Sequence, residues 1–166
     1  MGKKSIKENK NIYQTSREAL ELTREKASDL MEYISPDRIE KIESEKSLPH
    51  PDEIVAMAKC YKKPELKNYY CTHECPIGQI DVPEIQMKDL SQIILEMLAT
   101  LNQVEKQKNR LIEITADGEI TDDEFKDFAE IRGMLSKVSQ TVDSLTLWVE
   151  NSIANGKIDS SFINEK

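Results

Sequence analysis

Residues 23–43 of the chain read TREKASDLMEYISPDRIEKIE and contain two helix start signals. Thr23 is a residue that caps helix N-termini, and the helix that it opens is expected to run through residue 31. Ser35 is a second cap, and Pro36 and Asp37 suit the first turn because proline needs no amide partner there and the helix dipole favours a negative charge. This stretch therefore predicts two short helices joined by a turn.

The residues on either side of this segment predict more short helices. Ile39 and Ile42 give the second helix one apolar face, and it is expected to end near Lys46 because prolines follow it. A further helix is expected over 52–61, where apolar residues recur at spacings of three and four. Residues 11–70 therefore predict a small domain of short helices.

The second half of the chain has apolar heptad repeats. The expected registers are Met87, Leu90, Ile94, Met97, Leu101, Val104, Lys108, Leu111 and Thr115, and then Phe128, Ile131, Leu135, Val138, Val142, Leu145 and Val149. Between them, Gly118 can end one helix, and Thr121 with Glu124 matches a capping box for the next. So short a turn makes the two helices antiparallel neighbours. Further apolar residues beside both registers predict that this hairpin also forms a homodimer.

The chain is therefore expected to be all-α, with a five-helix domain followed by a long antiparallel helical hairpin. The expected parts are a flexible basic arm (1–10), a helix-turn-helix domain (11–70), a linker containing Cys and Pro (71–83), the hairpin (84–155) and a flexible tail (156–166).

Composition narrows the classes of function. The 166 residues carry a net charge of −8 and only five glycines, so a glycine-rich phosphate loop is absent. No enzyme signature and no cofactor motif is found, and no apolar run is long enough to span a bilayer. We expect a cytoplasmic protein that is not an enzyme and has no membrane partner. Residues 71–166 contain 9 basic and 18 acidic residues, so the acidic hairpin could also dock a protein partner.

The order of capped helices resembles that of a known family. The residues that carry the likeness are Arg17, Leu20, Leu22, the segment 23–28, Ser35, Ile39, Ile42, Glu43, Pro49 and the helix around 54–58. Together they resemble the lambda-repressor/Cro-like (XRE) helix-turn-helix family over residues 17–61. The resemblance implies five packed helices, the third of which enters the major groove of DNA. It also implies a buried ion pair between Arg17 and Glu43.

The resemblance further implies double-stranded DNA as the partner. The residues that it places on the DNA are Arg24, Ser35, Asp37, Arg38, Lys41, Ser44 and Lys46. Arg24 and Ser35, at helix N-termini, would face phosphates. Along the third helix, Asp37, Arg38 and Lys41 would lie with Pro36 at the base-reading edge. Ser44 and Lys46 would contact the DNA backbone. The implied function is a DNA-binding transcriptional regulator that dimerises through the hairpin.

The chain departs from the family at several positions. Glu21, Glu32 and Glu45 stand where the family usually has glycine, and the turn before Ser35 is one residue longer. Glutamates in and after the third helix add negative charge where DNA binding rewards Lys and Arg. The alternative is therefore a non-enzymatic protein-interaction module whose helix-turn-helix head does not read bases.

Two groups of residues could hold a metal ion. Cys60, Cys71, His73 and Cys75 supply the ligands of a zinc site with three thiolates and one imidazole. Residues two apart point to opposite sides of a helix, so the last three converge only in an irregular loop, and packed, reduced thiols are the alternative. The turn 117–124 resembles part of a calcium loop but lacks its first Asp, so a glycine-ended helical turn is the alternative there. We expect no bound metal.

Overall fold

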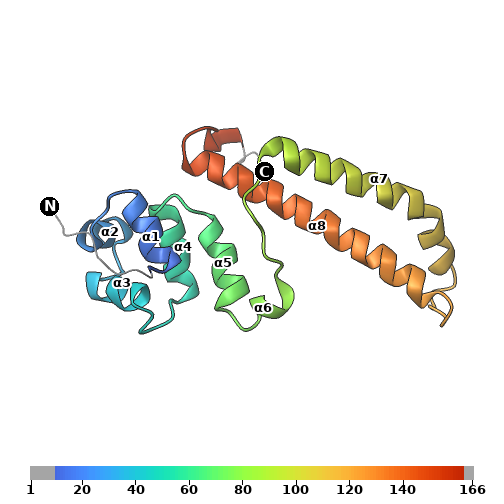
Figure 1. The fold of residues 1–166 in the computed structure, drawn as a ribbon, viewed down its shortest axis with the longest axis horizontal. Helices are drawn as coiled ribbons and strands as arrows, with labels where there is room; N and C mark the ends of the chain where they lie inside the picture. The colour runs from blue at the N-terminus through green and yellow to red at the C-terminus, as the bar shows by residue number, and fades with distance from the viewer. Residues whose placement is uncertain (1–9, 163–166) are drawn as a thin grey trace. The chain divides into compact units, whose positions relative to one another are not determined.

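The computed structural model describes residues 10–162, and every regular element in that range is a helix (Figure 1). The elements are α1 (Ile12–Ala19), α2 (Arg24–Met31), α3 (Pro36–Glu43), α4 (Pro51–Cys60), α5 (Glu65–His73), α6 (Gly78–Asp81), α7 (Leu90–Ile114), α8 (Phe125–Ala154) and the 3-10 helix η1 (Ser160–Phe162). The expected all-α class is confirmed. In this part of the chain, no helix has both the length and the apolar character needed to cross a membrane.

The chain divides into two compact units. The head unit contains the residues up to 84 together with those from 150 onward, and the hairpin unit contains residues 85–149. The expected basic arm falls almost wholly on residues 1–9, which lie outside the described residues, as do 163–166 at the other end.

Side-chain caps open α2 and α3. The Thr23 hydroxyl accepts a hydrogen bond from the Lys26 amide, and the Ser35 hydroxyl accepts one from the Arg38 amide, each at 3.2 Å. Each cap pairs an amide that the helix itself leaves free. Both start signals expected in the segment 23–43 are therefore confirmed.

The first five helices share one hydrophobic core. Its fully enclosed members are Tyr13, Ala27, Met31, Ile34, Ile39, Ile42, Ile54, Met57, Ala58, Tyr61 and Leu66. Burying a large apolar side chain contributes about 1.5–3 kcal/mol, so this cluster is the main stabilising feature of the head unit. The apolar faces expected on the helices over 36–43 and 52–61 are the faces that enter this core.

Residues 71–83, which the sequence predicted to be a linker, contain helical structure. Helix α5 continues through His73, and the short helix α6 packs against it. A Cβ atom on Gly78 would lie 2.2 Å from the Cys71 carbonyl oxygen, so only glycine permits this contact. The Asn68 amide group also donates to the Pro83 carbonyl at 2.9 Å. The segment is therefore part of the head unit.

The last turn of α8 also belongs to the head unit. Lys67 of α5 pairs with Glu150 at 2.8 Å. After α8, Gly156 adopts a left-handed conformation (φ 70°), and the Lys157 amide donates to the Ser152 carbonyl at 2.8 Å. The described part of the expected flexible tail, 156–162, therefore forms a helix-ending turn followed by η1.

In the hairpin unit, α7 and α8 run antiparallel on either side of a turn at Gly118 (φ 78°) (Figure 1). The Glu124 carboxylate accepts hydrogen bonds from the Thr121 amide at 3.1 Å and hydroxyl at 2.8 Å. The reach from Glu124 back to the Thr121 amide is the contact that the capping-box prediction required. Arg110 of α7 pairs with Asp127 of α8 at 2.7 Å, so these two residues lie at similar heights on the two helices.

The stripe that faces inward in the hairpin is not the expected register. The buried and half-buried residues at heptad spacing, called the seam below, are Ile93, Met97, Thr100, Val104, Gln107, Leu111 and Ile114 on α7, and Ile131, Met134, Val138, Thr141, Leu145 and Trp148 on α8. The expected registers agree with the seam at Met97, Val104, Leu111, Ile131, Val138 and Leu145. The expected positions 94, 101, 108, 115, 135, 142 and 149 each lie one residue after a seam residue. Met87 and Leu90 are exposed before the seam begins, and Phe128 is half-buried. Thr100 can be buried because its hydroxyl donates to the Glu96 carbonyl at 2.7 Å.

Three of the four left-handed non-glycine residues in the described chain are glutamates that stand where the resembled family has glycine. The φ angles are 55° at Glu21, 63° at Glu32 and 61° at Glu45. Side chains disfavour this conformation because Cβ crowds the carbonyl oxygen. The left-handed Glu45 also ends α3 at Glu43, which is earlier than the expected end near Lys46.

Replacing these glutamates by glycine is expected to stabilise the head unit. Glu21→Gly, Glu32→Gly and Glu45→Gly should each raise the free energy of unfolding by about 0.5–1 kcal/mol, because relief of backbone strain exceeds the extra entropy lost by glycine. Urea unfolding of each variant measures the change. The matched control is Glu25→Gly inside α2, which should lower stability by about 0.5–1 kcal/mol. Destabilisation by all four variants would contradict the prediction.

Candidate nucleic-acid interface

Helix α3 separates its residues cleanly into an inner and an outer side. Ile39 and Ile42 are in the core, with 0% and 2% of their surface exposed. Asp37 and Lys41 are four residues apart on the opposite side, where both are exposed. The Ser35 cap stands at the exposed beginning of the helix. The outer side of α3 is therefore polar and open to solvent.

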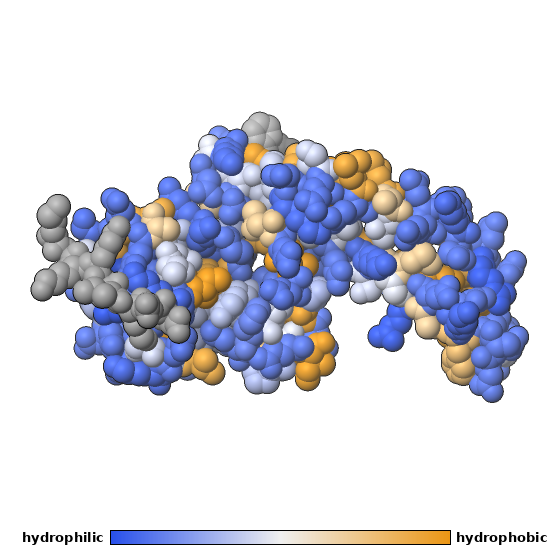
Figure 2. Space-filling view, in the orientation of Figure 1, coloured by the Kyte–Doolittle hydropathy of each residue, from blue (hydrophilic) through white to orange (hydrophobic). Residues whose placement is uncertain are grey.

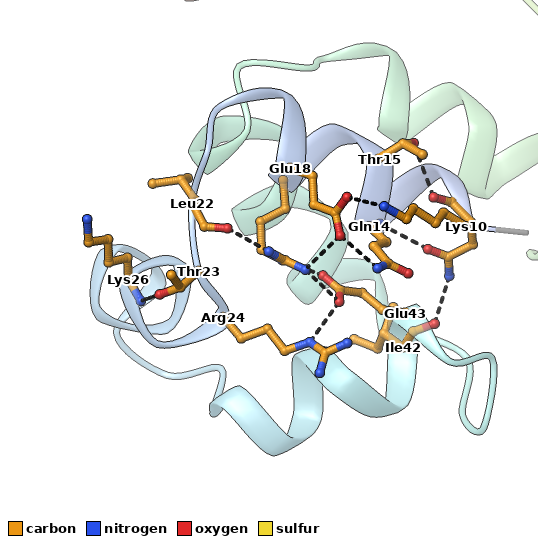
Figure 3. A network of polar contacts seen from close by, with 12 residues as sticks. Lys10, Gln14, Thr15, Glu18, Leu22, Thr23, Arg24, Lys26, Ile42 and Glu43 are labelled. Carbon is orange, nitrogen blue, oxygen red and sulfur yellow. Dashed lines mark hydrogen bonds and ion pairs between the residues drawn. The ribbon is translucent and has the colours of Figure 1, made fainter. Parts of the chain in front are cut away.

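Glu43, at the end of α3, is the centre of a network of charged side chains (Figure 3). Arg17 of α1 donates two hydrogen bonds to its carboxylate, at 2.6 and 2.9 Å. Arg17 also donates to the Leu22 carbonyl. Burial opposes the charge of Arg17, but the bonds to Glu43 outweigh burial and raise the pKa of the guanidinium. The ion pair that the resemblance implied is confirmed.

Arg24, at the first position of α2, is partly engaged by the same carboxylate. Its Nε donates to Glu43 at 2.8 Å, and about a third of its side chain remains exposed (34%). The bond accounts for one nitrogen of the guanidinium, so donors remain for an outside ligand. Arg24 is thus both a support for α3 and an open cation at a helix N-terminus.

Arg38 is held inside the head unit. Its Nε and Nη2 donate to the Glu53 carboxylate, each at 2.7 Å. It also donates to the Ser47 hydroxyl at 2.6 Å and to the Leu48 carbonyl at 2.8 Å. The bonds to Glu53 raise the pKa of Arg38, so the charge is permanent. The resemblance placed Arg38 at a base edge, whereas its donors here fasten α3 to the loop before α4.

The Arg38–Glu53 pair makes stability depend on pH. Burial opposes ionisation of Glu53, but bonds from Arg38 and the His50 amide outweigh it and lower the pKa of the carboxyl. A lowered pKa contributes stability above the unfolded-state value of about 4.3, and this contribution is lost as the pH falls through the folded-state value. Glu53→Gln should therefore be less stable than the wild type at pH 7, with a smaller deficit at pH 3. Urea unfolding at both values tests this, and the exposed Glu32→Gln is the control. An equal deficit at both values would contradict the prediction.

Two lysines and a serine near the end of α3 remain accessible. Lys41 is exposed, and no ion pair joins it to another residue within 10–162. The Lys46 ammonium lies 3.1 Å from Glu40, with 65% of its side chain exposed. The Ser44 hydroxyl faces the Lys41 carbonyl at 3.4 Å. Lys41 and Lys46 are therefore the cations that α3 and its following turn offer to solvent.

Acidic side chains share this surface. Asp37, Glu40 and Glu45 lie on α3 or directly after it, against the two lysines. The Lys46–Glu40 contact is exposed, so it contributes little energy and can open for another ligand. At the N-terminal side, Lys10 is paired with Glu18 of α1 at 2.7 Å. The remaining lysines of the expected arm lie outside the described residues.

The structure does not gather the cysteines into a ligand set. Cys60 ends α4, Cys71 lies in α5, and Cys75 follows α5; all three are free thiols. The His73 ring is stacked on Tyr69 at 4.3 Å, with Nδ1 2.8 Å from the Thr72 hydroxyl. In the described chain, no three His, Cys, Asp or Glu side chains are grouped as a metal site requires, in the expected calcium-like turn or elsewhere.

Glu53 is the functional partner that the sequence did not reveal. It holds Arg38 across fifteen positions of the chain, and no local spacing rule connects residues so far apart. The only available signal was its position three residues after His50, as in a capping box. A scan against protein-family models found no match for this chain, and searches of the curated proteins and of the solved structures found none either.

Proposed function

We propose that the chain is a DNA-binding transcriptional regulator of the helix-turn-helix type, acting in the cytoplasm, with the outer side of α3 directed at the duplex. The observation that carries the proposal is the backbone of the head unit. Left-handed angles occur at Glu21, Glu32 and Glu45, the three positions where the resembled family has glycine. Positive φ angles at these positions support the same arrangement of helices as in the resembled family, because the turns there need the conformation that glycine adopts most easily.

Within this proposal the residues have distinct roles. Lys41 and Lys46 contact phosphates, because both are exposed cations at one end of α3. Asp37 accepts a hydrogen bond at a base edge, for example from a cytosine amino group. Arg38 positions α3 through Glu53 rather than reading a base.

Three further residues complete the surface. The guanidinium N–H groups of Arg24 that are not bonded to Glu43 donate to a DNA phosphate beside the beginning of α2. Ser35 and Ser44, at the two ends of α3, lie beside the DNA backbone. The hairpin unit joins two copies, so that two α3 helices can meet successive turns of one duplex, about 34 Å apart.

A second function is favoured by the charge of the same surface. Asp37, Glu40 and Glu45 outnumber the lysines beside α3, and counterion release gives acidic groups no advantage on DNA. On this alternative, the head unit is a protein-interaction module that binds a basic partner without reading bases.

Selection from random DNA separates the two functions. The full-length protein is incubated with a library of random duplexes at low salt, and the retained fragments are sequenced over several rounds. Enrichment of one sequence, with affinity that falls steeply as salt is raised, is expected for the regulator. If no fragment is retained above the level of an unrelated acidic protein, the regulator proposal is wrong and the interaction module is favoured.

A further inference from the structure

The hairpin unit has a second stripe beside its seam. It consists of exposed residues that each directly follow a seam position: Ile94, Leu98, Leu101, Glu105, Lys108 and Ile112 on α7, and Arg132, Leu135, Ser139 and Val142 on α8. We call these residues the flank. Apart from Ile112, its apolar side chains occupy the part farther from the turn, and Figure 2 shows hydrophobic residues gathered over the first half of α7.

The flank residues of both helices lie on the same side of the hairpin. One residue of an α-helix turns the side-chain direction by about 100°, so each flank residue points roughly a quarter turn beyond the seam. For a viewer at one end of the hairpin, following the chain rotates the side chains clockwise on one helix and anticlockwise on its antiparallel neighbour. The seams of the two helices face each other, so a quarter turn on each brings both sets of flank residues to the same side. The flank is therefore one continuous face built from two helices.

The contact between Arg110 and Asp127 sets which flank residues share a height. Moving along both helices by equal steps from that pair puts Glu105 level with Arg132. The same steps put Leu101 within one residue of Leu135, and Ile94 within one residue of Val142. Glu105 and Arg132 thus share one height, and the apolar flank residues farther from the turn share the heights beyond it.

We propose that the occupant of this face is a second copy of the hairpin, related by a twofold axis parallel to the helices. Such an axis keeps every height and sets α7 of one copy against α8 of the other. Glu105 then meets Arg132 of the second copy, twice per dimer, and Leu101 meets Leu135 of the second copy. The result is a parallel pair of hairpins with a four-helix core.

The charges distinguish this arrangement from the alternative axis. If the axis were perpendicular to the helices and passed through the middle of the apolar flank residues 94–101, α7 would face α7 in the reverse direction, and Glu105 would lie opposite the start of α7, where Leu90 is 38% exposed. When the apolar flank residues of the two copies face each other, the parallel axis is the one that also sets Glu105 against Arg132. Within the chain, Glu105 has just an exposed contact with Lys108 at 3.6 Å, and Arg132 has no ion pair in the described residues, so both are free to pair across the dimer.

The test is a charge exchange in the full-length protein without DNA, measured by sedimentation at low salt. Glu105→Arg sets two arginines together at each contact, and Arg132→Glu sets two glutamates together. Each variant should weaken the dimer by about tenfold, since two ion pairs are replaced by two repulsions. An equimolar mixture of the two variants restores both pairs, so it should form a heterodimer with wild-type affinity.

Matched controls reverse the same charges on the other side of α8. Glu130→Arg and Lys137→Glu alter net charge equally and should leave the dimer unchanged. A mixture that associates no better than its components, equal weakening by the controls, or a wild type that stays monomeric would each overturn the inference. The inference rests on the dimerising part of the proposed function only. Because DNA is absent from the measurement, failure of DNA binding leaves its result unaffected.

Discussion

Glu43→Ala is expected to destabilise the head unit by about 3–5 kcal/mol, because it leaves a buried cation without its partner. The Arg17 side chain is 7% exposed and that of Glu43 is 1% exposed, so water cannot replace the missing carboxylate. The substitution also removes the bond that joins Arg24 to α3. A change of this size is a large part of the stability of a small domain. Hydrogen exchange of the α1 and α3 amides measures it in the head unit directly.

The control is Glu40→Ala in the same helix. The ion pair of Glu40 with Lys46 is exposed, so removal of Glu40 should change stability by less than about 0.5 kcal/mol. Should Glu43→Ala cost no more than Glu40→Ala, the two arginines do not depend on Glu43, and the account of the network is wrong.

Lys41→Glu combined with Lys46→Glu is expected to weaken DNA binding about a hundredfold at low salt, which corresponds to about 3 kcal/mol. Both side chains are exposed beside α3, and reversing them replaces two phosphate contacts by two repulsions. The slope of log affinity against log salt should become shallower by about two, one for each phosphate that is no longer neutralised. Fluorescence anisotropy with the fragment selected from random DNA measures both quantities.

A charge-matched control lies in the hairpin unit. Lys106→Glu combined with Lys137→Glu changes the net charge equally, away from α3 and from the flank, and should leave most of the affinity. Equal losses in the two double variants would show that DNA responds only to overall charge. In that case α3 is not the contact surface.

The local structure of the head unit could be predicted because its signals are local. A hydroxyl at Thr23 or Ser35 reaches an amide three residues away, and this geometry is the same in any protein. The apolar spacing of the helices likewise identified the faces that form the core. The exposure of Lys41 agrees with the same periodicity, since it lies opposite Ile39 and Ile42, although it was expected there only from the resemblance.

The roles of the arginines could not be predicted in this way. Arg38 was expected on the DNA because its position in α3 matches a contact position, but its bonds depend on where Glu53 and the loop at 47–48 are folded. The hairpin register has a similar cause. Two neighbouring stripes of the hairpin satisfied the heptad pattern, and the sequence favoured the more apolar one. The other stripe is the seam that faces inward. It can hold Thr100 and Thr141 because each hydroxyl bonds to a carbonyl of its own helix.

The sequence alone determined the all-α class, the beginnings of α2 and α3 and the two long helices of the hairpin, because caps, periodicity and turns act over a few residues. The tertiary structure decided which charges are engaged and which remain available, and which stripe of the hairpin is left exposed. Those outcomes depend on contacts between residues far apart in the chain. The folded backbone brings such residues together, and no local pattern records their distances.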